Sequence, residues 1–192
     1  MINSLIKNAK NIVHTILNYS VFVIYKCNGM PENVSVPRKG YELRLMTRED
    51  IMSSDDTLIS EQAWYGGDDT CIFACIVDGR IVALCVYWYG DRYLTRNFWP
   101  LKEKEAKLVQ LYTLPDMRGK GIAPMLIQHS AHVMMKHGFT NLFARIWHSN
   151  HSSRKAFEKS HWTAISTVIE IQPVASIKPF RFRIAKKGLA QQ

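Results

Sequence analysis

Residues 111–123 read Leu-Tyr-Thr-Leu-Pro-Asp-Met-Arg-Gly-Lys-Gly-Ile-Ala. The apolar start of this stretch predicts a strand that stops at Pro115, and the residues after Gly121 predict the first turn of a helix. Gly119 and Gly121 let the backbone come close to an anion. The first amides of the helix have no partner within it and point outward with the positive end of its dipole. The stretch therefore predicts a site for a phosphate or pyrophosphate group.

Two other glycine-rich phosphate loops fit less well. The Walker pattern requires Gly-x-x-x-x-Gly-Lys-Ser/Thr, but Ile122, Ala123 and Pro124 follow Gly121 and provide no hydroxyl for magnesium. The Rossmann pattern requires a third glycine and an acid about 20 residues further on, where this chain has Thr140. An ordinary strand, turn and helix with no ligand is the remaining alternative for a lone Gly-x-Gly.

The stretch resembles the acetyl-coenzyme A (acetyl-CoA) motif of the GCN5-related N-acetyltransferase (GNAT) superfamily. That motif is a strand, then Val-x-Pro-x-x-Arg/Gln-Gly-x-Gly-Ile-Gly/Ala, then a helix. Seven positions match it, with threonine in place of the usual valine: Thr113, Pro115, Arg118, Gly119, Gly121, Ile122 and Ala123. The resemblance implies acetyl-CoA as the acyl donor. It implies contacts to the cofactor from Leu111, Tyr112, Thr113, Arg118, Gly119, Lys120, Gly121, Ile122 and Ala123.

A second motif lies in residues 150–162, which are similar to the family pattern Asn-x-x-Ala/Ser-x-x-x-Tyr-x-x-x-Gly-Phe. Asn150 and Ser153 match it, and the chain ends the motif with His-Trp in place of Gly-Phe. Phe157 stands where the family has tyrosine. The resemblance implies that Asn150, Ser153 and Phe157 also contact the cofactor.

The phenylalanine bears on mechanism. In the family that tyrosine often protonates the departing thiolate, and Phe157 has no hydroxyl. Ser153, His148 or water would then donate the proton, or the thiolate would leave unassisted, because a thiol with a pKa of about 8.5 is a fair leaving group. Apolar packing against coenzyme A is the favoured role of Phe157.

Hydrophobic periodicity and turn residues predict the elements after residue 40. They are a strand at 41–46, helices from Arg48 and at 57–65, strands at 71–77 and 80–89 around Asp78-Gly79, a loop at 90–104, a strand at 106–114, a helix at 120–137, a strand at 141–147, a helix at 152–159, and strands at 162–171 and 180–185. This order is similar to that of the GNAT fold. It implies an α/β (α+β) class, with a mixed, mostly antiparallel sheet that is splayed at the acetyl-CoA site and flanked by helices.

The first 40 residues are expected to precede the N-acetyltransferase domain, which takes residues 41–192. Residues 1–18 have apolar spacing that predicts an extra, basic amphipathic helix, residues 20–26 a strand, and residues 29–40 a linker. The helix either packs on the domain or on a sister subunit of a homodimer, or lies on an anionic membrane surface. This start resembles a branch of the superfamily found with bacterial surface-polysaccharide synthesis, which implies an amino-sugar acceptor.

Length and composition indicate a globular protein with one main core. The chain has 192 residues, of which 47% are apolar and 21% charged, and a net charge of +9. Coenzyme A is a polyanion and accounts for part of that charge, so no nucleic-acid partner is expected. The alternating basic and aromatic residues of 178–187 are either a nucleic-acid face or, as we favour, a half-buried strand with Phe180, Phe182 and Ile184 inward and Arg181 and Arg183 outward.

Cysteine and histidine positions give no reason to expect a metal. Cys27, Cys71, Cys75 and Cys85 show no Cys-x-x-Cys spacing and are expected to be reduced and buried, and the seven histidines are scattered. No apolar run reaches about 18 residues and no secretion signal is recognisable, so the cytoplasm is the expected location.

An N-acetyltransferase also needs a base, because a protonated amine has no lone pair with which to attack. Glu105 at the start of the central strand, His148 after the next strand, and Tyr112 acting through water are the candidates.

The acceptor pocket is expected to lie among residues 64–69, residues 88–99 and the final hairpin. Asp68, Asp69 or Asp91 would hold an ammonium there, or these acids are simply turn residues. The expected function is direct acetyl transfer from acetyl-CoA to a primary amine of a small molecule or amino sugar. The alternatives are a protein N-terminal or lysine acetyltransferase, and a non-catalytic regulator that binds coenzyme A or nucleic acid.

Overall fold

The computed structural model describes residues 17–27, 29, 39–94, 99–173 and 179–185. Their elements are β1 (Leu17–Cys27), β2 (Glu42–Met46), α2 (Arg48–Met52), α3 (Thr57–Ser60), the 3-10 helix η1 (Glu61–Tyr65), β3 (Thr70–Val77), β4 (Arg80–Trp88), α4 (Gly90–Leu94), β5 (Glu105–Thr113), the 3-10 turn η2 (Pro115–Met117), α5 (Ile122–Lys136), β6 (Asn141–Trp147), α6 (His151–Lys159), β7 (Thr163–Pro173) and β8 (Phe180–Ala185). The predicted order of elements after residue 40 is confirmed, except that the predicted loop at 90–104 begins with the short helix α4.

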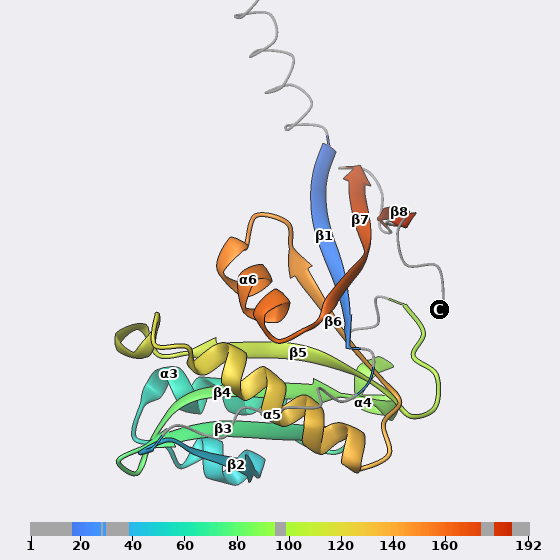
Figure 1. The fold of residues 1–192 in the computed structure, drawn as a ribbon. Helices are drawn as coiled ribbons and strands as arrows, with labels where there is room; N and C mark the ends of the chain where they lie inside the picture. Colours follow the sequence, from blue (N-terminus) through green and yellow to red (C-terminus); the bar gives the residue numbers. More distant parts are fainter. Residues whose placement is uncertain (1–16, 28, 30–38, 95–98, 174–178, 186–192) are drawn as a thin grey trace, which may run out of the picture.

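All eight of these strands join one sheet in the order β2-β3-β4-β5-β6-β1-β7-β8 (Figure 1). The pair β5–β6 is parallel and the other neighbouring pairs are antiparallel. The predicted mixed, mostly antiparallel sheet is therefore confirmed. In Figure 1, β3, β4 and β5 run across the lower part of the molecule, whereas β1 and β7 rise above them beside α6.

Helices cover both faces of the sheet at β4. Tyr87 hydrogen-bonds Ser130 of α5 at 3.1 Å between the two hydroxyl oxygens. The next residue, Trp88, donates from its indole nitrogen to the carbonyl oxygen of Tyr65 in η1 at 2.7 Å. Because successive side chains of a strand point to opposite faces, α5 lies on one face of the sheet and η1 on the other. Both side chains are fully buried, and the main core forms around them.

Strand β1 lies inside the sheet, between β6 and β7. Its side chains from Phe22 to Tyr25 are buried, and Tyr25 packs against Phe157 of α6 with 5.8 Å between ring centroids. The phenol of Tyr25 donates to Glu158 at 2.7 Å, and burial raises the pKa of Tyr25. Residues 17–27 were expected to precede the domain, and the pairing corrects that placement. Residues 17 and 18, which were predicted to end the N-terminal helix, belong to β1. The rest of that prediction, residues 1–16, lies outside the described residues.

Strand β8 reverses the predicted orientation. Phe180, Phe182 and Ile184 are all more than half exposed. Arg181 donates to Glu170 at 2.7 Å and Arg183 donates to the hydroxyl of Ser166 at 3.1 Å, so the arginines are the residues that contact β7. The prediction that the aromatic residues face inward was wrong because alternation shows that a strand has two faces but not which face meets the protein.

The four cysteines are free thiols, and Cys27, Cys75 and Cys85 are buried, as predicted, whereas Cys71 is only half-buried. Burial raises the pKa of the Cys85 thiol to about 12 and that of the Cys27 thiol to about 11. In the described part of the chain no helix is long and apolar enough to cross a membrane. The same residues contain no group of three or more His, Cys, Asp or Glu placed to hold a metal ion.

Candidate active site

The glycine-rich turn has the backbone geometry of an anion site. Gly119 and Gly121 have φ angles of 77° and 78°, in the left-handed region that favours glycine. Gly121 precedes α5, and no side chain caps that helix end. The amides of Ile122 and Ala123 in the first turn are therefore available to an anion. Arg118 closes the turn by donating from Nε to the carbonyl oxygen of Thr113 at 3.1 Å.

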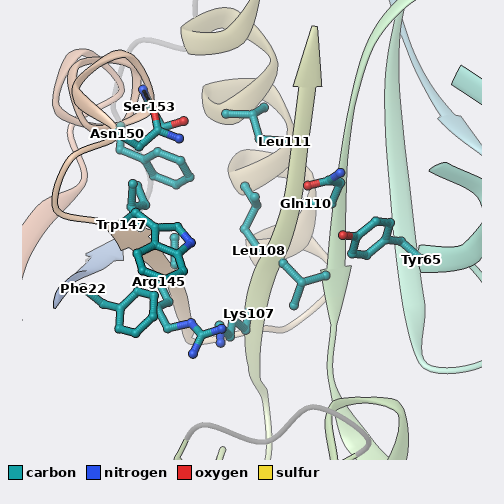
Figure 2. A pocket seen from close by; sticks show the side chains of 14 residues that line it. Phe22, Tyr65, Lys107, Leu108, Gln110, Leu111, Arg145, Trp147, Asn150 and Ser153 are labelled. Carbon is teal, nitrogen blue, oxygen red and sulfur yellow. Dashed lines mark hydrogen bonds between the residues drawn. The ribbon is translucent and has the colours of Figure 1, made fainter. Parts of the chain in front are cut away.

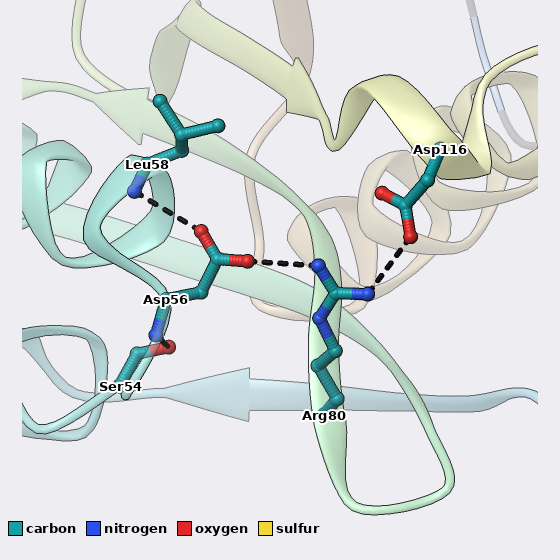
Figure 3. Close-up of polar contacts among 5 residues, drawn as sticks. All are labelled: Ser54, Asp56, Leu58, Arg80 and Asp116. Carbon is teal, nitrogen blue, oxygen red and sulfur yellow. Dashed lines mark hydrogen bonds and ion pairs between the residues drawn. The ribbon is translucent and has the colours of Figure 1, made fainter.

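A charged link holds the turn to the first half of the chain (Figure 3). The Arg80 guanidinium contacts Asp116 of η2 and Asp56, each at 2.8 Å. Asp56 also caps α3, because its carboxylate accepts the amide of Leu58 at 3.1 Å. The hydrogen bond from Arg80 holds the pKa of Asp116 below its usual value. This link fixes the turn relative to the hairpin of β3 and β4.

The turn cavity, of about 520 Å³, lies beside the glycine-rich turn between β5, α5 and α6. Ten of the twelve predicted cofactor residues line it: Leu111, Tyr112, Thr113, Arg118, Gly119, Gly121, Ile122, Ala123, Asn150 and Ser153. Lys120, which the cavity lining does not include, lies with its ammonium 3.3 Å from the sulfur of Met117.

Two lysines that sequence reasoning missed, Lys155 and Lys159, also line the turn cavity. They lie four residues apart on α6, and this spacing places both on one face of the helix. That spacing is the signal in the sequence that would have found them.

Strand β5 leaves β6 halfway along its length. Parallel pairing joins Glu105–Leu108 to Asn141–Ala144 and does not continue. At the same place the register with β4 shifts, so that Val86 pairs with Gln110 and Tyr87 with Leu108. Val109 is therefore the extra residue of a β-bulge, which bends a strand locally. The predicted splay of the sheet is present at this bulge.

A second cavity, which we call the notch cavity, lies in this opening between β5 and β6 and has a volume of about 250 Å³ (Figure 2). Its lining comes from β1, η1, β5, β6 and α6: Phe22, Tyr65, Lys107, Leu108, Val109, Gln110, Leu111, Ala144, Arg145, Ile146, Trp147, Asn150, Ser153 and Phe157. Leu111, Asn150 and Ser153 line both cavities. The turn cavity and the notch cavity therefore adjoin at these three residues.

Asn150 organises the junction. It caps α6, and its side-chain oxygen accepts the amide of Ser153 at 3.1 Å and the hydroxyl of Ser152 at 3.0 Å. Ser153 is thereby held at the start of α6 with its side chain at the boundary between the two cavities. Of the proton donors considered for the thiolate, Ser153 is the one placed there.

Phe157, the remaining predicted cofactor residue, lines the notch cavity and is 2% exposed. Its ring packs against Tyr25 and, edge to face at 5.0 Å, against Trp162. It therefore supports the wall of the notch by apolar packing, as its chemistry requires.

The three residues considered as bases lie apart from one another. Glu105 is at the far end of β5, where its carboxylate accepts the Lys102 amide at 2.9 Å and the Asn141 side chain at 3.1 Å. His148 is exposed after β6, with its amide donating to Val21 at 2.8 Å. Tyr112 lines the turn cavity. None of the three is among the residues that line the notch cavity in the described part of the chain.

The acids considered for an ammonium lie outside the notch cavity as well. Asp69 accepts the backbone amide of Asp91 at 3.0 Å and has a φ of 52°, so it acts as a turn residue, and Asp68 beside it is exposed. From the segment 64–69, only Tyr65 reaches the cavity. The indole nitrogen of Trp88 donates to the carbonyl oxygen of Tyr65, and this hydrogen bond keeps Tyr65 in position.

Two cations line the notch cavity in place of these acids, and one of them is buried and the other half-buried. Lys107 is 4% exposed, and its ammonium lies 4.7 Å from the ring centroid of Trp99. The guanidinium carbon of Arg145 lies 4.4 Å from the ring centroid of Phe22. Sequence reasoning missed both, because β5 and β6 meet here only in the folded chain.

The fold and the site together define an α/β protein with a glycine-rich turn, which leads into an uncapped helix, beside a split in its sheet. A family model described as the acetyltransferase (GNAT) family matches residues 40–162, more than half of the chain. The chain belongs to this family, which uses acetyl-CoA as acyl donor.

Solved structures share the fold at low sequence identity. A GNAT-family acetyltransferase from Colwellia psychrerythraea is 15% identical, with a TM-score of 0.58 over 86% of this chain and 60% of that one. A GCN5-related N-acetyltransferase from Sphaerobacter thermophilus is 11% identical, with a TM-score of 0.57 over 87% of this chain and 56% of that one. The chain thus spans less than two thirds of the length of these structures.

Proposed function

We propose that the protein transfers an acetyl group from acetyl-CoA directly to a primary amine of a small molecule. The observation that carries the proposal is the junction of the turn cavity and the notch cavity at Leu111, Asn150 and Ser153. One cavity has an anion-binding helix end, and the other opens through the sheet where β5 leaves β6. A donor and an acceptor held in these cavities would meet at the junction.

The turn cavity fits coenzyme A. The φ angles of Gly119 and Gly121 expose the first amides of α5, and Lys155 and Lys159 add positive charge from α6. Bound acetyl-CoA supplies a thioester, whose carbonyl carbon bonds to the amine nitrogen as the carbon–sulfur bond breaks.

Groups of the protein itself would then assist at two points, the carbonyl of the thioester and the leaving sulfur. Beyond Leu108, the edge of β5 is released from β6, which leaves backbone groups facing the notch to polarise a carbonyl. The hydroxyl of Ser153, a residue that lines both cavities, would donate a proton to the leaving sulfur. The amine loses its own proton to solvent.

A small acceptor is supported by the size of the notch cavity, about 250 Å³, and by the rings of Phe22, Tyr65 and Trp147 in its wall. Protein substrates would require an open groove along the surface. Rings of this kind also suit a sugar or another cyclic acceptor.

Cofactor binding and turnover test the proposal separately. Acetyl-CoA is expected to raise the Tm of the protein at micromolar concentration, and thiol release with a panel of primary amines is expected to identify an acceptor. No shift with acetyl-CoA or coenzyme A would refute the cofactor assignment. Binding without turnover would favour the non-catalytic regulator, and acetylation of peptides alone would favour a protein acetyltransferase.

A thiol reagent can detect the coenzyme A released in this assay, because the buried cysteines of the protein react little with it. The raised pKa values of Cys27, Cys75 and Cys85 keep these thiols protonated at neutral pH. A protein sample without acetyl-CoA gives the background.

A further inference from the structure

We propose that the acceptor is an amine that also carries an anionic group, a carboxylate or a phosphate, and that Lys107 and Arg145 bind this group. The inference rests on the proposed function, because it names the class of acceptor for that reaction. It starts from the charges that line the notch cavity.

The charged residues among the described lining of the notch cavity are both cations. They are Lys107 from β5 and Arg145 from β6, and the lining contains no aspartate or glutamate. An ammonium acceptor without an anion would meet repulsion from both. An anionic group would gain charge-assisted hydrogen bonds from them.

Aromatic rings hold both cations in place without cancelling their charge. The ammonium of Lys107 lies 4.7 Å from the ring centroid of Trp99 and 5.4 Å from that of Tyr93. The Arg145 guanidinium lies over Phe22. A ring attracts a cation through its quadrupole but has no net charge, so these contacts do not themselves neutralise the two cations.

The burial of Lys107 strengthens the argument. Lysine is almost never fully buried, because its charge loses hydration. With only 4% of Lys107 exposed, its ammonium acts in a medium of lower effective dielectric than water, where an anion is bound more strongly.

The two cations are placed for the acceptor and not for coenzyme A. Neither is among the residues that line the turn cavity. Figure 2 shows both at the end of the notch away from Leu111 and Ser153, where the two cavities adjoin. The anionic group would therefore bind at one end of the notch, with the amine directed toward the junction.

Matched acceptors test the inference. Glucosamine 6-phosphate and a set of α-amino acids carry an anion, whereas glucosamine and the corresponding amino-acid amides do not. The anionic member of each pair is expected to have a kcat/KM at least about tenfold higher. Preference for phosphate over carboxylate, or the reverse, identifies which anion the site takes.

Substitutions locate the effect. Lys107→Met and Arg145→Gln are each expected to raise KM for the anionic amine by about 10- to 100-fold, with acetyl-CoA affinity within about twofold of wild type. Arg145→Lys is expected to recover part of the loss. Lys26→Met removes a lysine from the ring of Phe143, outside the notch lining, and is the matched control. If Lys107→Met does not fold, Arg145→Gln, at a half-buried position, carries the test.

The outcomes separate the two proposals. Equal or better turnover of the uncharged amines overturns this inference and leaves the acetyltransferase assignment standing. Weaker acetyl-CoA binding in both variants, with the acceptor KM unchanged, assigns the cations to the cofactor and also overturns it. Failure of acetyl-CoA to bind the wild-type protein refutes the proposed function itself.

Discussion

The turn cavity and the notch cavity adjoin, yet they are built differently. The described lining of the turn cavity comes entirely from two short stretches, residues 111–124 and 150–159, and its proposed anion site is made of backbone amides and glycine conformation. The notch cavity draws side chains from five elements between Phe22 and Phe157. A backbone site binds a constant chemical group, whereas a side-chain site changes with single substitutions. The difference suits a common donor and a particular acceptor.

The largest expected effect tests whether acetyl-CoA binding at the turn cavity depends on backbone geometry. Gly121→Val places a β-branched residue at a φ of 78° and moves the first amides of α5. Charge-assisted hydrogen bonds are worth about 1.5–3 kcal/mol each, so loss of one or two lowers acetyl-CoA affinity by about 100-fold. Calorimetric titration measures the affinity.

Gly138→Val is the matched control for this change. Gly138 has a φ of 92° and follows the other end of α5, where an added Cβ meets no atom within 4 Å. It is expected to lower stability by about 1–2 kcal/mol without weakening acetyl-CoA binding. Unchanged affinity in Gly121→Val would show that the turn is not the pyrophosphate site.

The junction of the cavities gives the next effect. Ser153→Ala removes the hydroxyl that we propose protonates the thiolate and is expected to lower kcat by about 3- to 10-fold, a small loss because a thiolate is a fair leaving group. Ser152→Ala, whose hydroxyl bonds Asn150 and lines only the turn cavity, is the control. Thiol release at saturating substrates measures kcat. Equal losses in the two variants would point to the cap of α6 and not to proton transfer.

A smaller effect is expected from the ion pairs that Arg80 forms beside the glycine-rich turn. Arg80→Met breaks the contacts to Asp56 and Asp116 and is expected to weaken acetyl-CoA binding by about two- to fivefold. The difference from wild type should shrink in high salt, because exposed ion pairs are screened. Arg44→Met, which removes an exposed pair with Glu42, controls for the change in net charge. A salt-independent loss would mean that the arginine acts by packing.

The smallest effect concerns α5, the helix that carries the turn. Burial, with a contribution from His132, lowers the pKa of His129 below 6.5, its value in the unfolded chain. The unfolded state then binds more protons in acid, so this contribution to stability is present above about pH 6.5 and is lost as the pH falls below it. Urea unfolding at pH 8.0 and pH 5.5 is expected to show a smaller loss in His129→Gln than in wild type. The exposed His151→Gln should behave as wild type, and an equal loss in all three would contradict the assignment.

The local parts of the fold were predictable because their causes are local. Thr47 caps α2 and exchanges hydrogen bonds with Asp50, as its place before a helix indicated. The Asp78-Gly79 turn joins β3 and β4, and α5 begins within two residues of the predicted start. Each of these depends on residues only a few positions apart.

The surroundings of the notch cavity were less predictable, because they depend on contacts between residues far apart in the sequence. Nothing local to residues 20–26 indicates that β1 enters the sheet between β6 and β7, because its partners are more than a hundred residues away. The orientation of β8 likewise depends on which of its faces meets β7, where Arg181 and Arg183 find Glu170 and Ser166. Glu105 was considered for its place on β5 alone, but its distance from the notch is a property of the whole sheet.

The sequence alone determined the proposed donor site, since backbone conformation at Gly119 and Gly121 and the free amides of a helix end follow from neighbouring residues. The tertiary structure alone decided which side chains line the notch cavity, the proposed acceptor site. Lys107 and Arg145 line one cavity because β5 bulges at Val109 and separates from β6 beyond Leu108, and Phe22 reaches Arg145 because β1 lies next to β6 in the sheet. Contacts between side chains distant in sequence arise from packing, and packing is settled by the chain as a whole.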